Sequence, residues 1–126
     1  FVTFNGRGFD VPFLMLRSAI LGVSPTRDLM DGRYLYQQKD GKHIDLADQL
    51  SFYGATARKP ALHLYCRAFG ITSPKEEGIT GDNVSALFRE GKCETIARYN
   101  CRDILATMQL YKKWRQYLAP RSFRNS

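Results

Sequence analysis

Two aspartates, Asp10 and Asp103, are the residues of this sequence whose types and positions best suit chemistry. Asp10 follows an apolar, strand-like run and the turn-forming residues 5–8, and it opens a helical pattern. A carboxylate in that position lies at the C-terminal edge of a strand, where α/β sheets gather their ligands. Asp is also a preferred N-cap residue, so helix capping is the competing interpretation of Asp10.

The second aspartate comes with a tyrosine. Tyr99 and Asp103 are four residues apart in a helical pattern, so they share one helix face and can reach the same ligand. Asp103 lies on or beside the predicted buried stripe, which consists of Ile96, Ile104, Met108, Tyr111 and Leu118. A carboxylate next to a core needs a partner. That partner is either a bound cation or, in the structural interpretation, a neighbouring group that Asp103 caps or pairs with.

Strands and helices must position these side chains. The spacing of apolar and turn-forming residues favours an α/β domain whose sheet is small for its number of helices. The predicted elements are a strand over 1–4, a helix over 9–21, extended segments over 30–36 and 43–46 with a turn at 39–42 between them, a strand end running into a helix over 45–53, a helix over 62–69, a loop over 71–82, a helix over 83–91 capped by Asp82, and a long helix over 94–118.

Length and composition indicate one globular domain over residues 1–126. The hydrophobic fraction of 44% and the charged fraction of 25% exclude a disordered, collagen-like or coiled-coil chain. No apolar run nears the ~18 residues that cross a bilayer, and no secretory signal pattern opens the chain, so we expect no membrane contact and a cytoplasmic protein. Three cysteines without CxxC spacing argue against a disulfide framework or zinc site and favour reduced thiols.

The net charge of +7 is concentrated near the end of the chain. Five basic residues and no acidic residue follow position 111; they are Lys112, Lys113, Arg115, Arg121 and Arg124. Such a segment suits a phosphate backbone, because binding releases counterions. A solvated helix end is the alternative interpretation.

Together these features resemble a known family. Residues 3–10, Thr-Phe-Asn-Gly-Arg-Gly-Phe-Asp, look like the second motif, and Tyr99-x-x-x-Asp103 looks like the third motif, of DEDDy-type 3′–5′ exonucleases. The closer resemblance, over nearly the whole chain, is to bacterial predicted exonucleases related to the proofreading domain of family B DNA polymerases. It implies an RNase H-like fold, with a mixed sheet flanked by helices, and release of nucleotides from single-stranded 3′ ends of DNA or RNA.

The resemblance also implies roles for individual residues. In such enzymes four carboxylates hold two divalent cations, Mg²⁺ or Mn²⁺, for phosphodiester hydrolysis. Asp103 would bind the cation that activates water, Tyr99 would hydrogen-bond that water, and Asp10 would hold the second cation. The terminal nucleotide would be oriented by Asn5 and stacked on Phe9.

One part of the family pattern is missing. The first motif, an Asp-x-Glu that precedes the second motif and supplies two of the four carboxylates, occurs nowhere in residues 1–126. The sequence is therefore either a fragment without the first strands of the sheet or a degraded relative. We expect residues 1–126 alone to be inactive and, through an exposed edge at residues 1–4, prone to self-association. The alternative function is a non-catalytic nucleic-acid-binding or interaction module that retains the fold.

Several other polar or aromatic residues have stronger structural interpretations. Asp45 and Asp48 can extend the acidic site, but a helix cap or a solvated face is favoured. His63 is interpreted as a histidine at the edge of the core, and Trp114 as part of the helix packing, although it can also stack on a base.

Overall fold

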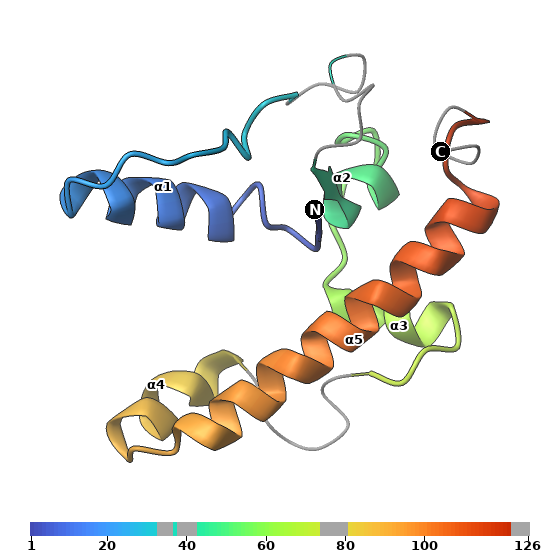
Figure 1. Ribbon diagram of the computed structural model, residues 1–126. Helices are drawn as coiled ribbons and strands as arrows, with labels where there is room; N and C mark the ends of the chain where they lie inside the picture. The colour runs from blue at the N-terminus through green and yellow to red at the C-terminus, as the bar shows by residue number, and fades with distance from the viewer. Residues whose placement is uncertain (33–36, 38–42, 74–80, 122–126) are drawn as a thin grey trace.

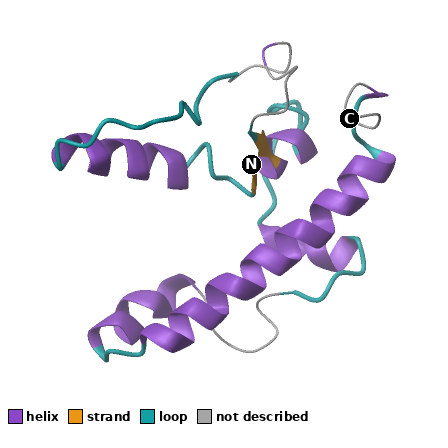
Figure 2. Cartoon of the chain, in the orientation of Figure 1, coloured by secondary structure: helices purple, strands orange, loops and turns teal. Residues whose placement is uncertain are grey.

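The computed structural model describes residues 1–32, 37, 43–73 and 81–121, with only the backbone at 81 and 82 (Figure 1). Helices dominate this part of the chain (Figure 2). The order of elements is β1 Val2–Thr3, α1 Asp10–Ile20, β2 Ile44–Asp45, α2 Leu46–Leu50, α3 Leu62–Ala68, α4 Gly81–Arg89 and α5 Cys93–Tyr117. The predicted α/β class with a small sheet is confirmed.

The two strands are short and parallel. Val2 pairs with Ile44 and Thr3 with Asp45, and α1 lies in the connection between the strands, as parallel pairing requires a crossover. Both strands are shorter than predicted. The pairing ends after Thr3 because Asn5 adopts a left-handed φ of 61° and turns the chain away from the sheet.

Helix α5 is the longest element, and α2, α3, α4 and β1 are in contact with it (Figure 1). Its buried face consists of Ala106, Leu110 and Trp114, which are four residues apart and so follow one side of the helix. Leu46 and Cys66 complete the fully buried centre. Trp114 therefore packs inside the domain, as the structural interpretation of this residue predicted.

The predicted buried stripe on this helix was partly wrong. Ile104, Met108 and Leu118 are exposed rather than buried, and the exposed fraction of Ile104 is 58%. The reason is that Leu46 of α2 and Cys66 of α3 pack in one cluster with Leu110, whereas Ile104 and Met108 border an open cavity. Apolar spacing identified a helix but assigned its covered side incorrectly.

Helix α1 stands apart from α3, α4 and α5 (Figure 1). Val11 is its only buried residue, and its amide N donates to the carbonyl of Gly6 at 2.8 Å. Large apolar side chains elsewhere on and beside the helix are exposed, including Phe13, Leu16 and Ile20, the last with an exposed fraction of 74%. The part of the chain that the structure describes therefore leaves an unusually apolar helix uncovered.

Other predicted boundaries shift by one to a few residues. The helix predicted over 83–91 begins earlier, at Gly81, so Asp82 lies inside the helix rather than at its cap. Residues 30–32 form no strand, while residues 33–36, the turn at 39–42 and most of the loop at 71–82 lie outside the described residues. The helices predicted over 9–21, 62–69 and 94–118 are confirmed within one residue at each end.

Among the described residues, no helix combines the length and the apolar character that crossing a membrane requires.

Replacing Leu110 by alanine should lower the free energy of unfolding by about 2–5 kcal/mol, because the side chain is fully buried and its loss leaves a cavity. Leu105→Ala, on the exposed side of the same helix, should change it by less than about 1 kcal/mol. Urea denaturation followed by circular dichroism measures both values. Equal effects of the two substitutions would contradict the assignment of the buried face.

Candidate functional site

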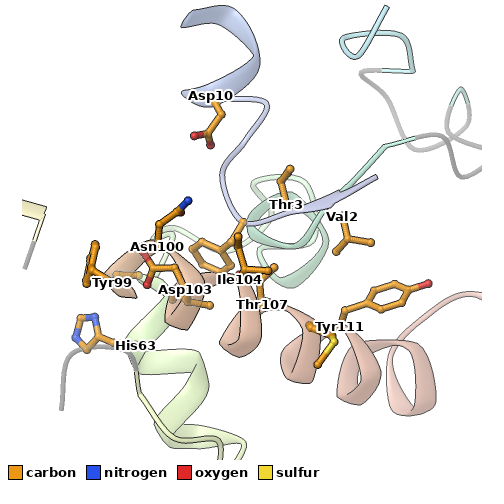
Figure 3. Close-up of a pocket in the computed structure, with 14 residues that line it drawn as sticks. Val2, Thr3, Asp10, His63, Tyr99, Asn100, Asp103, Ile104, Thr107 and Tyr111 are labelled. Carbon is orange, nitrogen blue, oxygen red and sulfur yellow. The ribbon is translucent and has the colours of Figure 1, made fainter. Parts of the chain in front are cut away.

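A cavity of about 520 Å³ lies between the start of β1, the first residue of α1, the start of α3 and the middle of α5 (Figure 3). One part of its wall is apolar and includes Val2, Ile104 and Met108. The other part is polar and includes Asp10, His63, Tyr99, Asn100, Asp103 and Thr107. The cavity is the place where side chains from both ends of the chain meet.

Asp10, Tyr99 and Asp103 all line this cavity, as the sequence predicted for a shared site. Asp10 is the first residue of α1, with Phe9 at the N-cap position, so the N-cap interpretation of Asp10 is wrong. Asp10 is instead free of a capping role and projects toward the cavity from above α5 (Figure 3).

The turn that delivers Asp10 is held by a buried carboxylate. Asp45, with an exposed fraction of 1%, accepts hydrogen bonds from the backbone N of Asn5 at 2.7 Å and of Arg7 at 2.8 Å. The same carboxylate accepts from the N of Ala47 at 3.0 Å and thereby caps α2. The cap interpretation of Asp45 is confirmed, and Asp48 pairs separately with Lys59 at 3.0 Å.

A glycine is needed in this turn. A Cβ atom at Gly6 would lie 2.5–2.7 Å from the side-chain atoms of Thr3, closer than atoms can approach. The Thr3 side chain cannot easily move, because its Oγ1 is hydrogen-bonded to Nε2 of His43 at 2.8 Å. The sequence analysis identified Asn5-Gly6 as turn-forming. The structure adds a second requirement for glycine at position 6, because no Cβ atom fits beside Thr3 of β1.

Arg7 and His43 extend the support from the turn to the segment before β2. The guanidinium of Arg7 is buried and donates to the carbonyls of Met30 at 3.1 Å, Asp31 at 2.7 Å and His43 at 3.2 Å. Nδ1 of His43 donates to the carbonyl of Leu29 at 2.8 Å, and its Nε2 is hydrogen-bonded to the Thr3 hydroxyl at 2.8 Å. Sequence reasoning missed both residues, since no local pattern reveals these distant partners.

On the other side of the cavity, Tyr99 is hydrogen-bonded to Asp103 one helical turn away. Burial, the charge of Asp103 and this hydrogen bond all raise the pKa of Tyr99, with burial first. Burial and, to a smaller extent, the charge of Asp103 also raise the pKa of the Cys66 thiol on α3. Tyr99 therefore stays protonated near neutral pH, and its hydroxyl remains a hydrogen-bond donor.

The two residues predicted to contact the nucleotide lie elsewhere. Neither Asn5 nor Phe9 is among the residues that line the cavity, and the ring of Phe9 is 66% exposed. Two residues that do line it, His63 and Asn100, were not predicted as site residues. Asn100 directly follows Tyr99 in the motif, which was the only signal available for it.

The described residues contain no cluster of three or more His, Cys, Asp or Glu side chains arranged to hold a metal ion. Asp10 and Asp103 nevertheless bring two carboxylates to one cavity. Carboxylate oxygens are the hard donors that Mg²⁺ and Mn²⁺ take in proteins. The pair therefore fits a part of the four-carboxylate set that the resemblance implies.

Comparison with known proteins identifies one family and one relative. The model of a family described as predicted 3′–5′ exonucleases related to the exonuclease domain of PolB matches residues 1–122. A DNA polymerase from Desulfurococcus sp. (strain Tok) is 29% identical to this chain over an alignment 126 residues long, gaps included. The alignment covers 90% of this chain. This chain spans only 16% of that polymerase. No solved structure matches the chain.

Removing the buried carboxylate should destabilise the domain. Asp45→Ala should lower the free energy of unfolding by about 2–6 kcal/mol, because the two buried amides of Arg7 and Ala47 lose their acceptor, at a cost of about 1–3 kcal/mol each. Asp48→Ala is the matched control, since its partner is an exposed lysine, and should cost less than about 1 kcal/mol. Chemical denaturation of both variants gives the comparison, and an Asp45→Ala protein as stable as the control would contradict the role of this carboxylate.

Proposed function

Because the chain belongs to the family of predicted 3′–5′ exonucleases related to the exonuclease domain of PolB, we propose that it is a metal-dependent exonuclease of the DEDDy type. It would release nucleotides one at a time from single-stranded 3′ ends. The observation that supports this most strongly is the meeting of Asp10, Tyr99 and Asp103 in one cavity. Family membership confirms the resemblance seen in the sequence, while the subtype, the cation and the substrate belong to this proposal.

In this proposal Asp10 and Asp103 hold the divalent cations, Mg²⁺ or Mn²⁺. The two carboxylates come from different elements, the start of α1 and the middle of α5, and a cation between them would relieve their repulsion. When bound, such cations stabilise the negative charge that builds up on a phosphate during hydrolysis. The position of Asp10 then depends on the turn held by Asp45.

Tyr99 supplies an uncharged donor beside Asp103. Its hydroxyl is protonated near neutral pH, and burial, the charge of Asp103 and a hydrogen bond to Asp103 raise its pKa further. During the reaction, we propose, the Tyr99 oxygen accepts a hydrogen bond from the water that attacks the phosphate. Partners of metal-binding carboxylates typically change affinity or activity by about 10–100-fold when they are removed.

The substrate would approach over the exposed side of the cavity. Phe9 directly precedes Asp10, and its exposed ring can stack on an unpaired terminal base, which favours a single strand of DNA or RNA over a duplex. Asn5 lies in the same turn and would orient that nucleotide from outside the cavity. The basic residues at the end of α5, Lys112, Lys113 and Arg115, would attract the phosphate backbone.

We further propose that the complete domain has the RNase H-like fold and takes its other two carboxylates from outside residues 1–126. These residues contain no Asp-x-Glu. The exposed apolar side of α1 supports the proposal that further protein structure packs on this helix, because so many large apolar side chains rarely face solvent in a monomer. Without that cover, self-association through α1 and the edge of β1 is expected.

A non-catalytic nucleic-acid-binding module is the alternative function. The basic residues Lys112, Lys113 and Arg115 favour it, because they can bind a phosphate backbone whether or not the cavity is catalytic. This alternative predicts salt-dependent binding of an oligonucleotide by the full-length protein without cleavage in Mg²⁺ or Mn²⁺.

In the full-length protein, Asp103→Asn should abolish Mg²⁺-dependent release of nucleotides from a labelled single strand, because one metal-binding carboxylate is lost. Tyr99→Phe should slow release about 10–100-fold while oligonucleotide binding is largely retained. Asp48→Asn, outside the cavity, should behave as wild type. A similar loss of binding in the Asp103 and Tyr99 variants, or full activity of Asp103→Asn, would count against these roles.

Residues 1–126 alone should show little or no nuclease activity. Asp10 and Asp103 supply only part of the ligand set, and a displacement of ~1 Å in the reacting groups is already costly. The test compares residues 1–126 with the full-length protein at matched Mg²⁺ and Mn²⁺, on the same labelled strand. Comparable activity of the two would overturn the four-carboxylate mechanism.

A further inference from the structure

Arg7 lies in the turn before Asp10, and the proposed mechanism gives it no role. Its side chain is buried, with an exposed fraction of 7%, although a charged side chain is almost never placed inside a protein without partners. The guanidinium donates to the carbonyls of Met30 at 3.1 Å, Asp31 at 2.7 Å and His43 at 3.2 Å. We call these three hydrogen bonds the Arg7 clasp.

The clasp joins parts of the chain that lie on either side of α1. Arg7 precedes the helix, whereas Met30 and Asp31 lie between the helix and β2, and His43 directly precedes β2. The backbone N of Arg7 also donates to the carboxylate of Asp45 in β2 at 2.8 Å. A single residue therefore ties the chain that enters α1 to the chain that returns from it, and ties both to the small sheet.

The position of Asp10 depends on this connection. The Asp10 side chain is exposed, so its place beside the cavity follows from the backbone from which it projects. Within the described part of the chain, Val11 is the only buried residue of α1. The amide N of Val11 donates to the carbonyl of Gly6 at 2.8 Å, which attaches the start of the helix to the turn that contains Arg7. A helix with so little packing takes its direction from the segments at its two ends, and Arg7 holds both.

Arginine suits this task better than lysine. The guanidinium is planar and presents its N–H groups in fixed directions, so two of its nitrogens bond three carbonyls at once. The single ammonium nitrogen of a lysine carries three donors on a flexible stem and fixes such an arrangement less well.

We propose that Arg7 is a positioning residue that holds Asp10 at the cation site by joining the two ends of α1, an inference that rests on the proposed exonuclease function. Arg7 is not among the residues that line the cavity, so it acts through Asp10 rather than by touching the cation or the substrate. Such support matters because a functional carboxylate must be held within about 0.5 Å of its productive position.

The test measures the Mn²⁺ affinity of the full-length protein by calorimetry, which requires no turnover. Arg7→Met keeps an unbranched side chain but removes the donors of the clasp. It should weaken Mn²⁺ binding about 10–100-fold, as loss of an outer partner of a metal ligand typically does. Arg7→Lys keeps the charge and should fall between Arg7→Met and wild type. Arg17→Met, which replaces an exposed arginine in the last turn of α1, is the matched control and should bind as wild type.

A double-mutant cycle separates positioning from a general loss of stability. If Arg7 acts through Asp10, Arg7→Met should change Mn²⁺ affinity little in a protein that already carries Asp10→Asn. Leu50→Ala opens a cavity in the core without touching the clasp. It should lower the urea midpoint of unfolding but leave Mn²⁺ affinity within about threefold of wild type, at a temperature where every variant is folded.

Three results would each overturn the inference: wild-type Mn²⁺ affinity in Arg7→Met, an equal loss of affinity with and without the Asp10 carboxylate, or a comparable loss in Leu50→Ala. Should Arg7→Met fail to fold, Arg7→Lys enters the same cycle and is judged by the same results. A full-length protein in which Arg7 and Asp10 are coupled in Mn²⁺ binding, but which releases no nucleotide from a labelled strand, would refute the exonuclease function and leave the positioning role supported.

Discussion

The buried carboxylate of Asp45 holds the turn from which Asp10 reaches the cavity. One side chain accepts from the backbone N–H groups of Asn5, Arg7 and Ala47, so it joins the end of β1, the turn after it and the start of α2. Three N–H groups satisfied by one charge make a tight and specific junction, because charge-assisted hydrogen bonds are about twice as strong as neutral ones. The junction determines where α1 begins and therefore where Asp10 lies.

The second constraint comes from α5, which provides both the core and the other half of the site. Its buried side carries Leu110 and Trp114, and its cavity side carries Tyr99 and Asp103. Because a helix is rigid over its length, packing at Trp114 fixes the position of Asp103 about three turns away. The cavity thus lies between the turn held by Asp45 and α5, and both are attached to one core, in which Ile44 and Leu46 pack with Leu110 and Trp114.

Local patterns predicted what depends on local geometry. The four-residue spacing of Tyr99 and Asp103 gave their shared face, and the Asn-Gly turn before Asp10 gave the start of α1. Local patterns could not predict long-range contacts. Asp45 was interpreted as a cap, but its hydrogen bonds to the backbone of Asn5 and Arg7 join residues about 40 positions apart in the sequence. Ile104 was assigned to the core because an apolar residue beside a cavity has the same sequence signature as one beneath a neighbouring helix.

A double-mutant cycle distinguishes a cation site shared by Asp10 and Asp103, which we propose, from two separate sites. Mn²⁺ affinity of the full-length protein is measured for wild type, Asp10→Asn, Asp103→Asn and the double variant. If the carboxylates share a site, the loss of Mn²⁺ binding free energy in the double variant should be smaller than the sum of the two single losses, by about 0.5–3 kcal/mol. The double variant should then bind Mn²⁺ only slightly more weakly than either single variant. Strictly additive effects, or Mn²⁺ binding that neither substitution changes, would contradict the account.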